Sequence, residues 1–319
     1  MNKLLVILGP TATGKTDLAL QLAGKFQGEL VACDSRQVYK GLDIGTGKEP
    51  REKGKVVKGK GFWEIDRAKI RMYDVADPKV QYTVADYVKE AAKAVEDISS
   101  RAKLPIIVGG TGFYLKALLL GLSNLSVPVD LKLRKQLEKL SVGELQEKLR
   151  AHSPGQLESL NESDRQNPRR LIRRLELLPH QPTNPYMETP QTQTGLSKDF
   201  DILKIGLTAP RAVLYKNIDS RVLTWIDQGI IEEARKLQAG GLSLQRMTEL
   251  GLEYGVLADY LAGKIKSEQE LIQFLQFKIH GYLRRQQTWF KKEKDVSWND
   301  ISDSGFSKRV EKLVNEWYA

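Results

Sequence analysis

Cysteine and histidine are scarce in this 319-residue chain, which has one cysteine, Cys33, and three histidines. A single cysteine excludes an intramolecular disulfide framework and any zinc module built on Cys-x-x-Cys pairs, and it fits a reducing compartment. The histidines are too scattered in sequence to indicate a metal site; they are His152, His180 and His280. These absences exclude disulfide-stabilised scaffolds and cysteine-based zinc proteins.

Long hydrophobic runs are also missing. The N-terminal apolar run, Leu4–Leu8, is too short for the core of a signal peptide. No stretch approaches the ~20 apolar residues that a membrane-spanning helix needs. We therefore expect a cytoplasmic protein without a membrane partner.

Acidic residues are outnumbered, because 50 Lys and Arg face 40 Asp and Glu and give a formal net charge of +10. This excess favours a polyanionic partner such as a nucleic acid, although many basic proteins carry only a solvated basic surface. With 41% hydrophobic and 28% charged residues, the chain has the composition of a globular protein. Its length suffices for two domains, or for one large α/β domain with an insertion.

Short apolar runs alternate with longer helical patterns in the first third of the chain, which is typical of βαβ units on a parallel sheet. The runs predict strands at Leu4–Leu8, Leu30–Cys33 and Leu104–Val108, and a later strand at Ile202–Leu207. Thr83 begins a capping box that opens a helix before the third strand. The predicted fold class is α/β, with a parallel sheet flanked by helices.

Residues 127–196 differ in character from the rest. They contain charged, helix-forming segments at Leu131–Leu140 and Gly143–Leu149, and then a loop rich in Pro, Thr and Gln from Pro179 to Gly195. We interpret this region as a helical insertion domain. The core would then comprise residues 1–126 and 197–319.

Two further segments have a clear bias. Helical periodicity dominates Arg211–Glu293, which predicts a helical C-terminal part of the core. The segment Arg51–Arg71 is basic and rich in Gly and Lys, and we expect it to form a mobile loop.

One motif stands out. The pattern G-x-x-x-x-G-K-[ST] is matched in full, directly after a predicted strand and directly before a helical pattern. Its glycines let successive backbone N–H groups point at an anion, Lys15 supplies a mobile cation, and the Thr16 hydroxyl can bind Mg²⁺. The motif predicts a polyphosphate or diphosphate site without singling out ATP, and an accidental Gly-rich turn is the alternative. Its residues are Gly9, Pro10, Thr11, Ala12, Thr13, Gly14, Lys15 and Thr16.

Two more segments follow predicted strands and should emerge at the same edge of the sheet, where open parallel sheets bind ligands. They are Asp34–Tyr39 and the glycine cluster Gly109–Gly112. Asp34 is a candidate Mg²⁺ ligand, a candidate general base, or simply a turn cap. The glycine cluster is either a tight turn or a substrate contact.

Two basic clusters lie elsewhere. The stretch Arg165–Arg174 contains no acid, and on a helix its arginines would repel one another unless anions met them, so we interpret it as a phosphate-binding face rather than a solvated one. Its arginines are Arg165, Arg169, Arg170, Arg173 and Arg174. The second cluster is interleaved with aromatic residues and comprises Lys278, Arg284, Arg285, Lys291 and Lys292.

The ordered set of motifs resembles the tRNA dimethylallyltransferase (tRNA isopentenyltransferase) family from about Lys3 to Trp298. A phosphate loop alone is shared by many families, but this series in this order is highly specific. The matching segments are Gly9–Thr16, Asp34–Tyr39, Gly41–Thr46, Tyr82–Tyr87, Gly109–Leu118 and Arg284–Phe290.

The resemblance implies a P-loop NTPase-like core with a helical insertion domain. It also implies transfer of a dimethylallyl group from dimethylallyl diphosphate to the N6 amine of the adenosine 3′-adjacent to the anticodon of tRNA, with Mg²⁺ as cofactor. The partners are then the tRNA anticodon stem-loop and the diphosphate, and we expect a monomer.

Residue roles follow by position from the same resemblance. The loop Gly9–Thr16 and Arg221 would bind the diphosphate, with Thr11 by its bridging oxygen and Thr16 on the metal. Asp34 would be the general base, so that Asp34, Thr11, Lys15 and Arg221 form the catalytic set. The tRNA-binding positions are Asp34, Ser35, Arg36, Gln37, Thr111, Arg134, Arg169, Arg170 and Arg173, to which the second basic cluster adds Arg284 and Arg285.

The chain departs from the family pattern at His280-Gly281, at Asn167 and Arg169, and in two motifs. The family usually has a His-His pair before Leu-Ile-Asp, where this sequence has Phe62–Asp66 followed by extra residues. The family's Gly-Tyr-[Arg/Lys] is replaced here by Gly251-Leu252-Glu253-Tyr254. These departures bear on tRNA binding and leave the diphosphate motif intact.

Two alternative functions remain open on the residues alone. An ATP-dependent P-loop kinase of a small molecule or nucleotide would use the same loop, Lys15 and Asp34, although arginine-rich helices are superfluous for a small acceptor. A non-catalytic RNA-binding ATPase would keep the basic faces but would not require Asp34.

Overall fold

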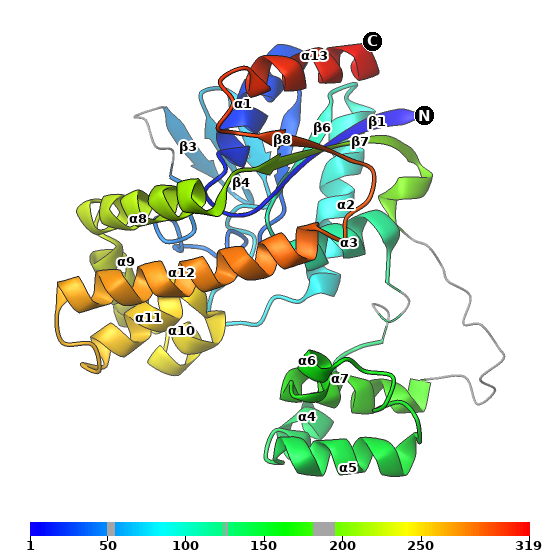
Figure 1. The fold of residues 1–319 in the computed structure, drawn as a ribbon, viewed down its shortest axis with the longest axis vertical. Coiled ribbons are helices and arrows are strands. Elements are labelled where there is room, and N and C mark those ends of the chain that lie inside the picture. The colour runs from blue at the N-terminus through cyan, green and yellow to red at the C-terminus, as the bar shows by residue number, and fades with distance from the viewer. Residues whose placement is uncertain (50–54, 123, 125–126, 181–194) are drawn as a thin grey trace. The chain divides into compact units, whose positions relative to one another are not determined.

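The structure is a computed structural model that describes residues 1–49, 55–122, 124, 127–180 and 195–319 (Figure 1). The chain forms two compact units. The α/β unit comprises Met1–Leu120 and Gly195–Ala319, and the helical unit comprises Gly121–Thr194. Each unit is described by itself.

An eight-stranded sheet organises the α/β unit, in the order β3-β4-β5-β2-β6-β1-β7-β8. The strands from β5 to β8 in this order pair in parallel, whereas β4 runs antiparallel to both β3 and β5. The strand bounds are β1 Asn2–Leu8, β2 Glu29–Ala32, β3 Val56–Gly59, β4 Phe62–Ile65, β5 Ala68–Arg71, β6 Pro105–Gly109, β7 Phe200–Thr208 and β8 Val296–Asp300.

The predicted α/β class is confirmed, and the four predicted strands correspond to β1, β2, β6 and β7. Leu4–Leu8 of β1 is fully buried, as expected for a strand covered on both faces of a parallel sheet. The predicted capping box at Thr83 is present at the start of α2, with the Thr83 and Asp86 side chains bonded to each other's backbone N–H groups.

Helices cover the sheet. The connection β1–α1–β2 runs across the sheet in the opposite direction to β5–α2–β6, so right-handed crossovers place α1 and α2 on opposite faces. The C-terminal α13 packs beside α1, where Phe26 and Tyr318 meet edge to face (Figure 1). The bounds are α1 Lys15–Phe26, α2 Val84–Ser100, α3 Gly112–Leu120 and α13 Phe306–Tyr318, with a 3₁₀ turn at Leu196–Lys198.

The segment Arg211–Glu293 is mainly helical, as its periodicity predicts. It lies between β7 and β8 in the sequence. Figure 1 shows α8 and α12 side by side, and these helices contact each other, for example where the Tyr215 and His280 rings stack. Their inner faces carry buried apolar residues at helical spacing, such as Leu214, Ile218 and Val222 of α8. The bounds are α8 Arg211–Asp227, α9 Ile230–Ala239, α10 Leu244–Leu250, α11 Leu252–Leu261 and α12 Glu268–Phe290.

The expectation of a mobile loop at Arg51–Arg71 is wrong for its described part, from Lys55 on, because this part forms β3, β4 and β5. Gly61 and the pair Asp66-Arg67 adopt positive φ in the two tight turns between these strands. Trp63 and Ile70, both fully buried, attach the hairpin to the core. The high Gly and Lys content concealed this strand pattern, and residues 51–54 lie outside the described part.

The helical unit has its own apolar core. The predicted helix at Leu131–Leu140 ends earlier, at Leu137, and the one at Gly143–Leu149 is longer, spanning Val142–His152. Of the loop predicted from Pro179 to Gly195, residues 181–194 lie outside the described part. The bounds are α4 Leu131–Leu137, α5 Val142–His152, α6 Glu162–Arg165, α7 Pro168–Leu177 and a 3₁₀ turn Leu178–His180; the core is Leu137, Leu145, Leu149, Leu157, Leu160, Leu171, Ile172 and Leu175.

Candidate active site

The phosphate-loop motif forms the turn between β1 and α1. Gly14 precedes α1 with φ 72°, a left-handed conformation that glycine adopts without strain. Its position leaves the first N–H groups of α1 without side-chain caps. Such groups, together with the helix dipole, favour an anion at this end of the helix.

The Lys15 side chain folds back over this loop. Its Nζ donates to the Pro10 carbonyl oxygen at 2.7 Å, and the Thr13 hydroxyl donates to the same oxygen at 2.9 Å. Burial is the main cause that lowers the pKa of Lys15 to about 7, and the positive charge of Arg221 is the second cause. The Asp34 carboxylate opposes that shift. Lys15, Arg221 and Asp34 therefore share one electrostatic environment.

Helix α8 contributes side chains to the loop from one face. Asn217 Nδ2 donates to the Ala12 carbonyl oxygen at 3.2 Å, and Arg221 Nη1 lies 3.4 Å from the Thr11 hydroxyl oxygen. The Arg221 guanidinium also lies 4.7 Å from the centre of the Trp225 ring. The spacing 217, 221 and 225 is one helical turn per step, so these side chains align along α8.

Asp34 begins the segment after β2. Its Oδ1 accepts from the backbone N–H of Arg36 at 2.8 Å and from that of Gln37 at 3.4 Å, which fixes the carboxylate on a tight turn. The Ser35 N–H donates to the Thr111 hydroxyl at 3.2 Å, so the segments after β2 and β6 meet as predicted. Asp34 is thus a turn cap, and it is also a half-buried residue of the cavity wall.

One cavity of about 390 Å³ is lined by predicted residues of both segments, although Ser35 and Thr111 are not on its wall. Its wall combines the phosphate loop, the turn after β2, the glycine pair after β6 and one face of α8. Predicted residues on the wall are Thr11, Ala12, Gly14, Lys15, Thr16, Asp34, Arg36, Gln37 and Arg221.

Several other wall residues were not predicted from the sequence. Gln286 of α12, which is 6% exposed, accepts from the Thr11 N–H at 2.8 Å and donates to the Gly110 carbonyl oxygen at 2.8 Å. It therefore bridges the phosphate loop and the glycine cluster. Glu253 of α11 is also buried on this wall, and burial raises its pKa while Arg36 opposes the shift.

The predicted tRNA-binding residues of the α/β unit lie in two places. Arg36 and Gln37 reach the cavity, and Arg36 lies 5.3 Å from the ring centre of Tyr282. Arg284 and Arg285 are exposed on α12, where Arg284 donates to the Tyr215 hydroxyl at 2.9 Å.

Several arginines of the helical unit have acidic partners, so the expected arginine stripe is partly compensated. Arg134 and Arg173 both bind the buried carboxylate of Glu176, at 2.6 and 3.1 Å. Arg170 forms an ion pair with Asp164. Both acids lie just outside the acid-free stretch Arg165–Arg174, so the window used for the prediction missed them.

The described residues hold no group of three or more His, Cys, Asp or Glu side chains that could bind a metal by themselves. Oxygen donors near the phosphate loop are the Thr16 hydroxyl and the carboxylates of Asp17 and Asp34, which line the cavity. Within the described ranges, no helix is long and apolar enough to cross a membrane.

Comparison with known proteins agrees with this geometry. The sequence matches the IPP transferase family over residues 37–293 and the isopentenyl transferase family over residues 2–68. It is 39% identical to tRNA dimethylallyltransferase 2 of Treponema denticola over 90% of this chain and 91% of that protein. It is 35% identical to tRNA dimethylallyltransferase of Anoxybacillus flavithermus, over 98% of this chain and 96% of that one.

Solved structures agree as well. The full-length tRNA isopentenylpyrophosphate transferase of Bacillus halodurans is 31% identical with a TM-score of 0.67, covering 100% of this chain and 96% of that one. A eukaryotic dimethylallyltransferase described as acting on tRNA is 25% identical with a TM-score of 0.79, covering 100% of this chain and 80% of that one. The predicted P-loop NTPase-like fold is thereby confirmed. With a family match over most of its length and relatives of this identity, the chain belongs to the tRNA dimethylallyltransferase family.

Proposed function

We propose that this chain transfers a dimethylallyl group from dimethylallyl diphosphate to the N6 amine of the adenosine 3′-adjacent to the anticodon of tRNA. One observation carries the proposal. A phosphate loop, an arginine of α8 and the Asp34 carboxylate line a single cavity, in a chain 39% identical to a protein named tRNA dimethylallyltransferase 2.

The phosphate loop, Lys15 and Arg221 would bind the diphosphate. As the bond between the allylic carbon and oxygen breaks, negative charge grows on the leaving diphosphate, and preorganised cations and N–H groups lower the energy of that state. Lys15 and Arg221 already face the same space, and their mutual repulsion falls when an anion sits between them. Thr11, held by both Arg221 and Gln286, would lie by the bridging oxygen.

Asp34 would act on the nucleophile. An adenine amine is a weak nucleophile, and it becomes competent when a base accepts one of its protons as the new carbon–nitrogen bond forms. The proton moves from N6 to the Asp34 carboxylate, and the diphosphate leaves with the electron pair of the broken bond. The adenosine must be flipped out of the anticodon loop to reach a cavity of this size.

The oxygen donors by the phosphate loop fit Mg²⁺, which takes few protein ligands and completes its octahedron with phosphate oxygens and water. Thr16 would hold the ion next to the diphosphate, and the ion would add positive charge to the leaving group.

The proposed tRNA contacts follow from exposure and charge. Ser35, Arg36, Gln37 and Thr111 lie around Asp34 and would surround the flipped nucleotide. The exposed Arg284 and Arg285 would bind phosphates near the cavity. In the helical unit the candidate phosphate ligands are Arg134, Arg169, Arg170 and Arg173.

The kinase alternative is not favoured, because the named relatives transfer prenyl groups rather than phosphoryl groups. The decisive experiment offers bulk unmodified tRNA to the protein with dimethylallyl diphosphate, or with ATP, and analyses the digested nucleosides by mass. We expect one prenylated adenosine with dimethylallyl diphosphate and no product with ATP. Product with ATP, or an unchanged adenosine pool with either donor, would refute the proposal.

A further inference from the structure

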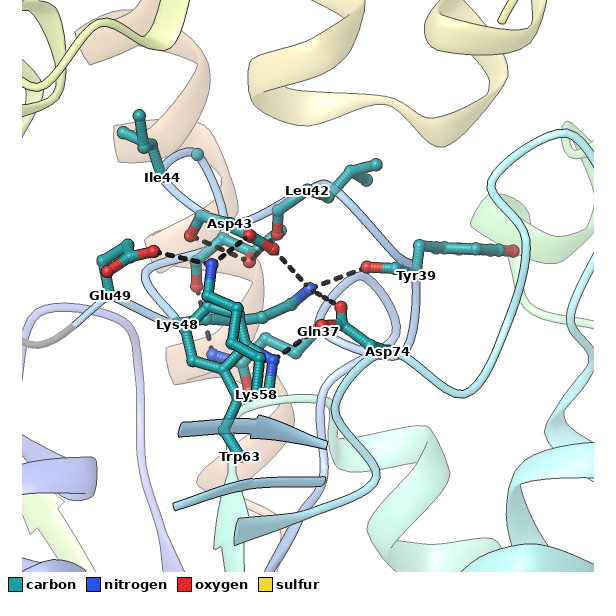
Figure 2. A network of polar contacts seen from close by, with 12 residues as sticks. Gln37, Tyr39, Leu42, Asp43, Ile44, Lys48, Glu49, Lys58, Trp63 and Asp74 are labelled. Carbon is teal, nitrogen blue, oxygen red and sulfur yellow. Dashed lines mark hydrogen bonds and ion pairs between the residues drawn. The ribbon is translucent and has the colours of Figure 1, made fainter. Parts of the chain in front are cut away.

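Lys48 is a lysine buried in the interior of the α/β unit, with 1% of its surface exposed. Its Nζ donates to the Tyr39 carbonyl oxygen at 2.7 Å, to Asp43 Oδ1 at 2.9 Å and to Asp74 Oδ1 at 2.5 Å (Figure 2). An ammonium group has three N–H donors, and all three are used. Lys48 therefore has no donor left for a ligand in the cavity.

The hairpin β3–β4 extends this network. Trp63 Nε1 donates to Asp74 Oδ2 at 2.6 Å, and Lys58 Nζ binds Asp43 Oδ2 at 2.8 Å and Glu49 at 3.0 Å (Figure 2). The Lys58 ammonium also lies 3.9 Å from the centre of the Trp63 ring. Burial would raise the pKa of Asp43, but Lys48 and Lys58 outweigh it and lower the pKa.

Residues Asp43–Glu49, which we call the 43–49 loop, are also held from the opposite side. Glu233 of α9 accepts from the backbone N–H groups of Asp43 and Ile44 at 3.0 and 2.8 Å. The Tyr254 hydroxyl of α11 donates to the other oxygen of Glu233 at 2.6 Å. The loop is thus bound on one side by a carboxylate and on the other by a buried ammonium.

This doubly held loop forms part of the cavity wall and contacts Arg221. Ile44, Gly45, Thr46 and Gly47 all line the cavity. Gly47 has φ 66°, and a Cβ added there would lie only 1.8 Å from Arg221 Nη2. The guanidinium therefore occupies the space that a side chain at position 47 would fill, and it also lies against Trp225 and Thr11.

A buried ion network is weak support for stability, because well-packed apolar residues of similar volume often stabilise as much or more. What such a network does fix is geometry, since each charge accepts only a few partner positions. Here the fixed element is the loop against which Arg221 lies.

We propose that Lys48 is a positioning residue for the diphosphate site. Together with Asp74 and Trp63, Lys48 holds the 43–49 loop in place, so that the Arg221 guanidinium packs against Gly47. The inference rests on the proposed prenyl transfer, in which Arg221 binds the leaving diphosphate. Trp63 belongs to a hairpin at which this sequence departs from the family's usual pattern, so the chain uses its own residues to brace the loop.

The test combines Lys48→Met and Trp63→Phe with Arg221→Ala in the full-length protein. Trp63→Phe keeps an aromatic ring but removes the N–H that binds Asp74, so it reports on the network even if Lys48→Met fails to fold. Steady-state kinetics with saturating tRNA give kcat and KM for the prenyl diphosphate, and calorimetry gives the Kd of inorganic pyrophosphate. Filter binding gives the Kd of tRNA.

We expect kcat/KM for the donor to fall about 10²-fold in Lys48→Met and about tenfold in Trp63→Phe, because a small misplacement of a binding group is costly. The Kd of pyrophosphate should rise in parallel and that of tRNA should not change. In the Arg221→Ala background, Trp63→Phe should have almost no further effect, since coupled residues are not additive.

Matched controls are Lys55→Met, on the exposed end of the same hairpin, and Trp298→Phe on β8, both of which should keep parental kinetics. Additive effects of Trp63→Phe and Arg221→Ala would overturn the proposal. Equal losses of tRNA and pyrophosphate affinity would also overturn it, because they would indicate general destabilisation of the protein. The parental protein must form prenylated tRNA before any variant is compared, so failure of the proposed function would be evident separately.

Discussion

The cavity of the α/β unit and the surface of the helical unit both carry several cations, but the two regions hold them differently. In the cavity, Lys15 binds the Pro10 carbonyl oxygen and Arg221 lies by the Thr11 hydroxyl. In the helical unit, Arg134 and Arg173 share the Glu176 carboxylate, which is 1% exposed.

The difference indicates two kinds of anion binding. Burial and the neighbouring Arg221 charge lower the pKa of Lys15 to about 7, which means that its protonated form is destabilised. An anion bound in the cavity would stabilise that protonated form. In the helical unit, carboxylates already neutralise part of the charge, and a phosphate would have to compete with them. The cavity suits one small anion, whereas the helical unit suits several weaker, exchangeable contacts.

The largest effect should come from Asp34→Asn, which tests whether the cavity is where the chemistry occurs. Asn keeps the Oδ1 acceptor for the Arg36 and Gln37 N–H groups but cannot take up the amine proton. We expect the chemical step to slow ~10²–10⁴-fold in single-turnover kinetics, with tRNA and donor binding retained.

A Mg²⁺ titration of the same variant separates two roles of Asp34. A general base is not replaced by metal, so the rate should stay low at every Mg²⁺ concentration. Restoration of most of the rate at high Mg²⁺, together with weakened donor affinity, would show that Asp34 is mainly a metal ligand.

Lys15→Ala should have the next largest effect, because it removes the cation that we propose to bind the leaving group. We expect kcat/KM for the donor to fall ~10²–10³-fold, the usual effect of removing one preorganised charge donor, while tRNA affinity and the fold persist. Lys25→Ala, at the exposed end of the same helix, is the control and should behave as the parent. Near-normal turnover of Lys15→Ala would remove the phosphate loop from the proposed site.

The pKa of Lys15, about 7, predicts a pH dependence confined to the cavity. The free site loses its Lys15 proton as the pH rises through 7, and the bound diphosphate favours the protonated form. Donor affinity should therefore fall above pH 7, by up to about tenfold per pH unit, and binding should take up a proton. Calorimetry in two buffers of different ionisation enthalpy measures that uptake.

The same comparison provides two controls for the pH experiment. Lys15→Arg carries a charge that does not titrate in this range, so its donor affinity should vary little with pH. The arginines proposed as phosphate ligands in the helical unit keep their charge throughout this pH range, so their contribution to tRNA affinity should not change in this window. A flat donor profile for the parent would contradict the assignment of Lys15.

The sequence predicts those parts of the site whose contacting residues lie close together along the chain, and it does not predict the parts whose residues lie far apart in sequence. The phosphate loop is a local motif, and Asp34 follows a strand, so both were identifiable. Gln286 binds Thr11 across 275 positions, and no local pattern records such a contact. Glu176 and Asp164 were missed for a simpler reason, because the charge count stopped one or two residues short of them.

The β3–β4 hairpin shows a different limit. Its high content of Lys and Gly is typical of a loop. Trp63 and Ile70 are nevertheless fully buried, and their burial stabilises the strands. Lys48 was not predictable either, since its burial depends on Asp74, 26 residues away. Composition describes the average of a segment, but a few long-range contacts determine whether it folds against the core.

The smallest expected effect distinguishes paired from unpaired arginines within the helical unit. Arg169 and Arg170 are both exposed at the start of α7, and Arg170 is paired with Asp164. Within the described part of the chain, no carboxylate pairs with the Arg169 side chain.

If both arginines bind tRNA phosphates, Arg169→Gln should reduce the slope of log affinity against log salt by ~1. Arg170→Gln should reduce it by less, because the Asp164 carboxylate already neutralises part of the Arg170 charge and fewer cations are then released from the tRNA phosphates. Filter binding of unmodified tRNA over a series of salt concentrations gives both slopes, and parental slopes for both variants would mean that this helix is only a solvated basic face.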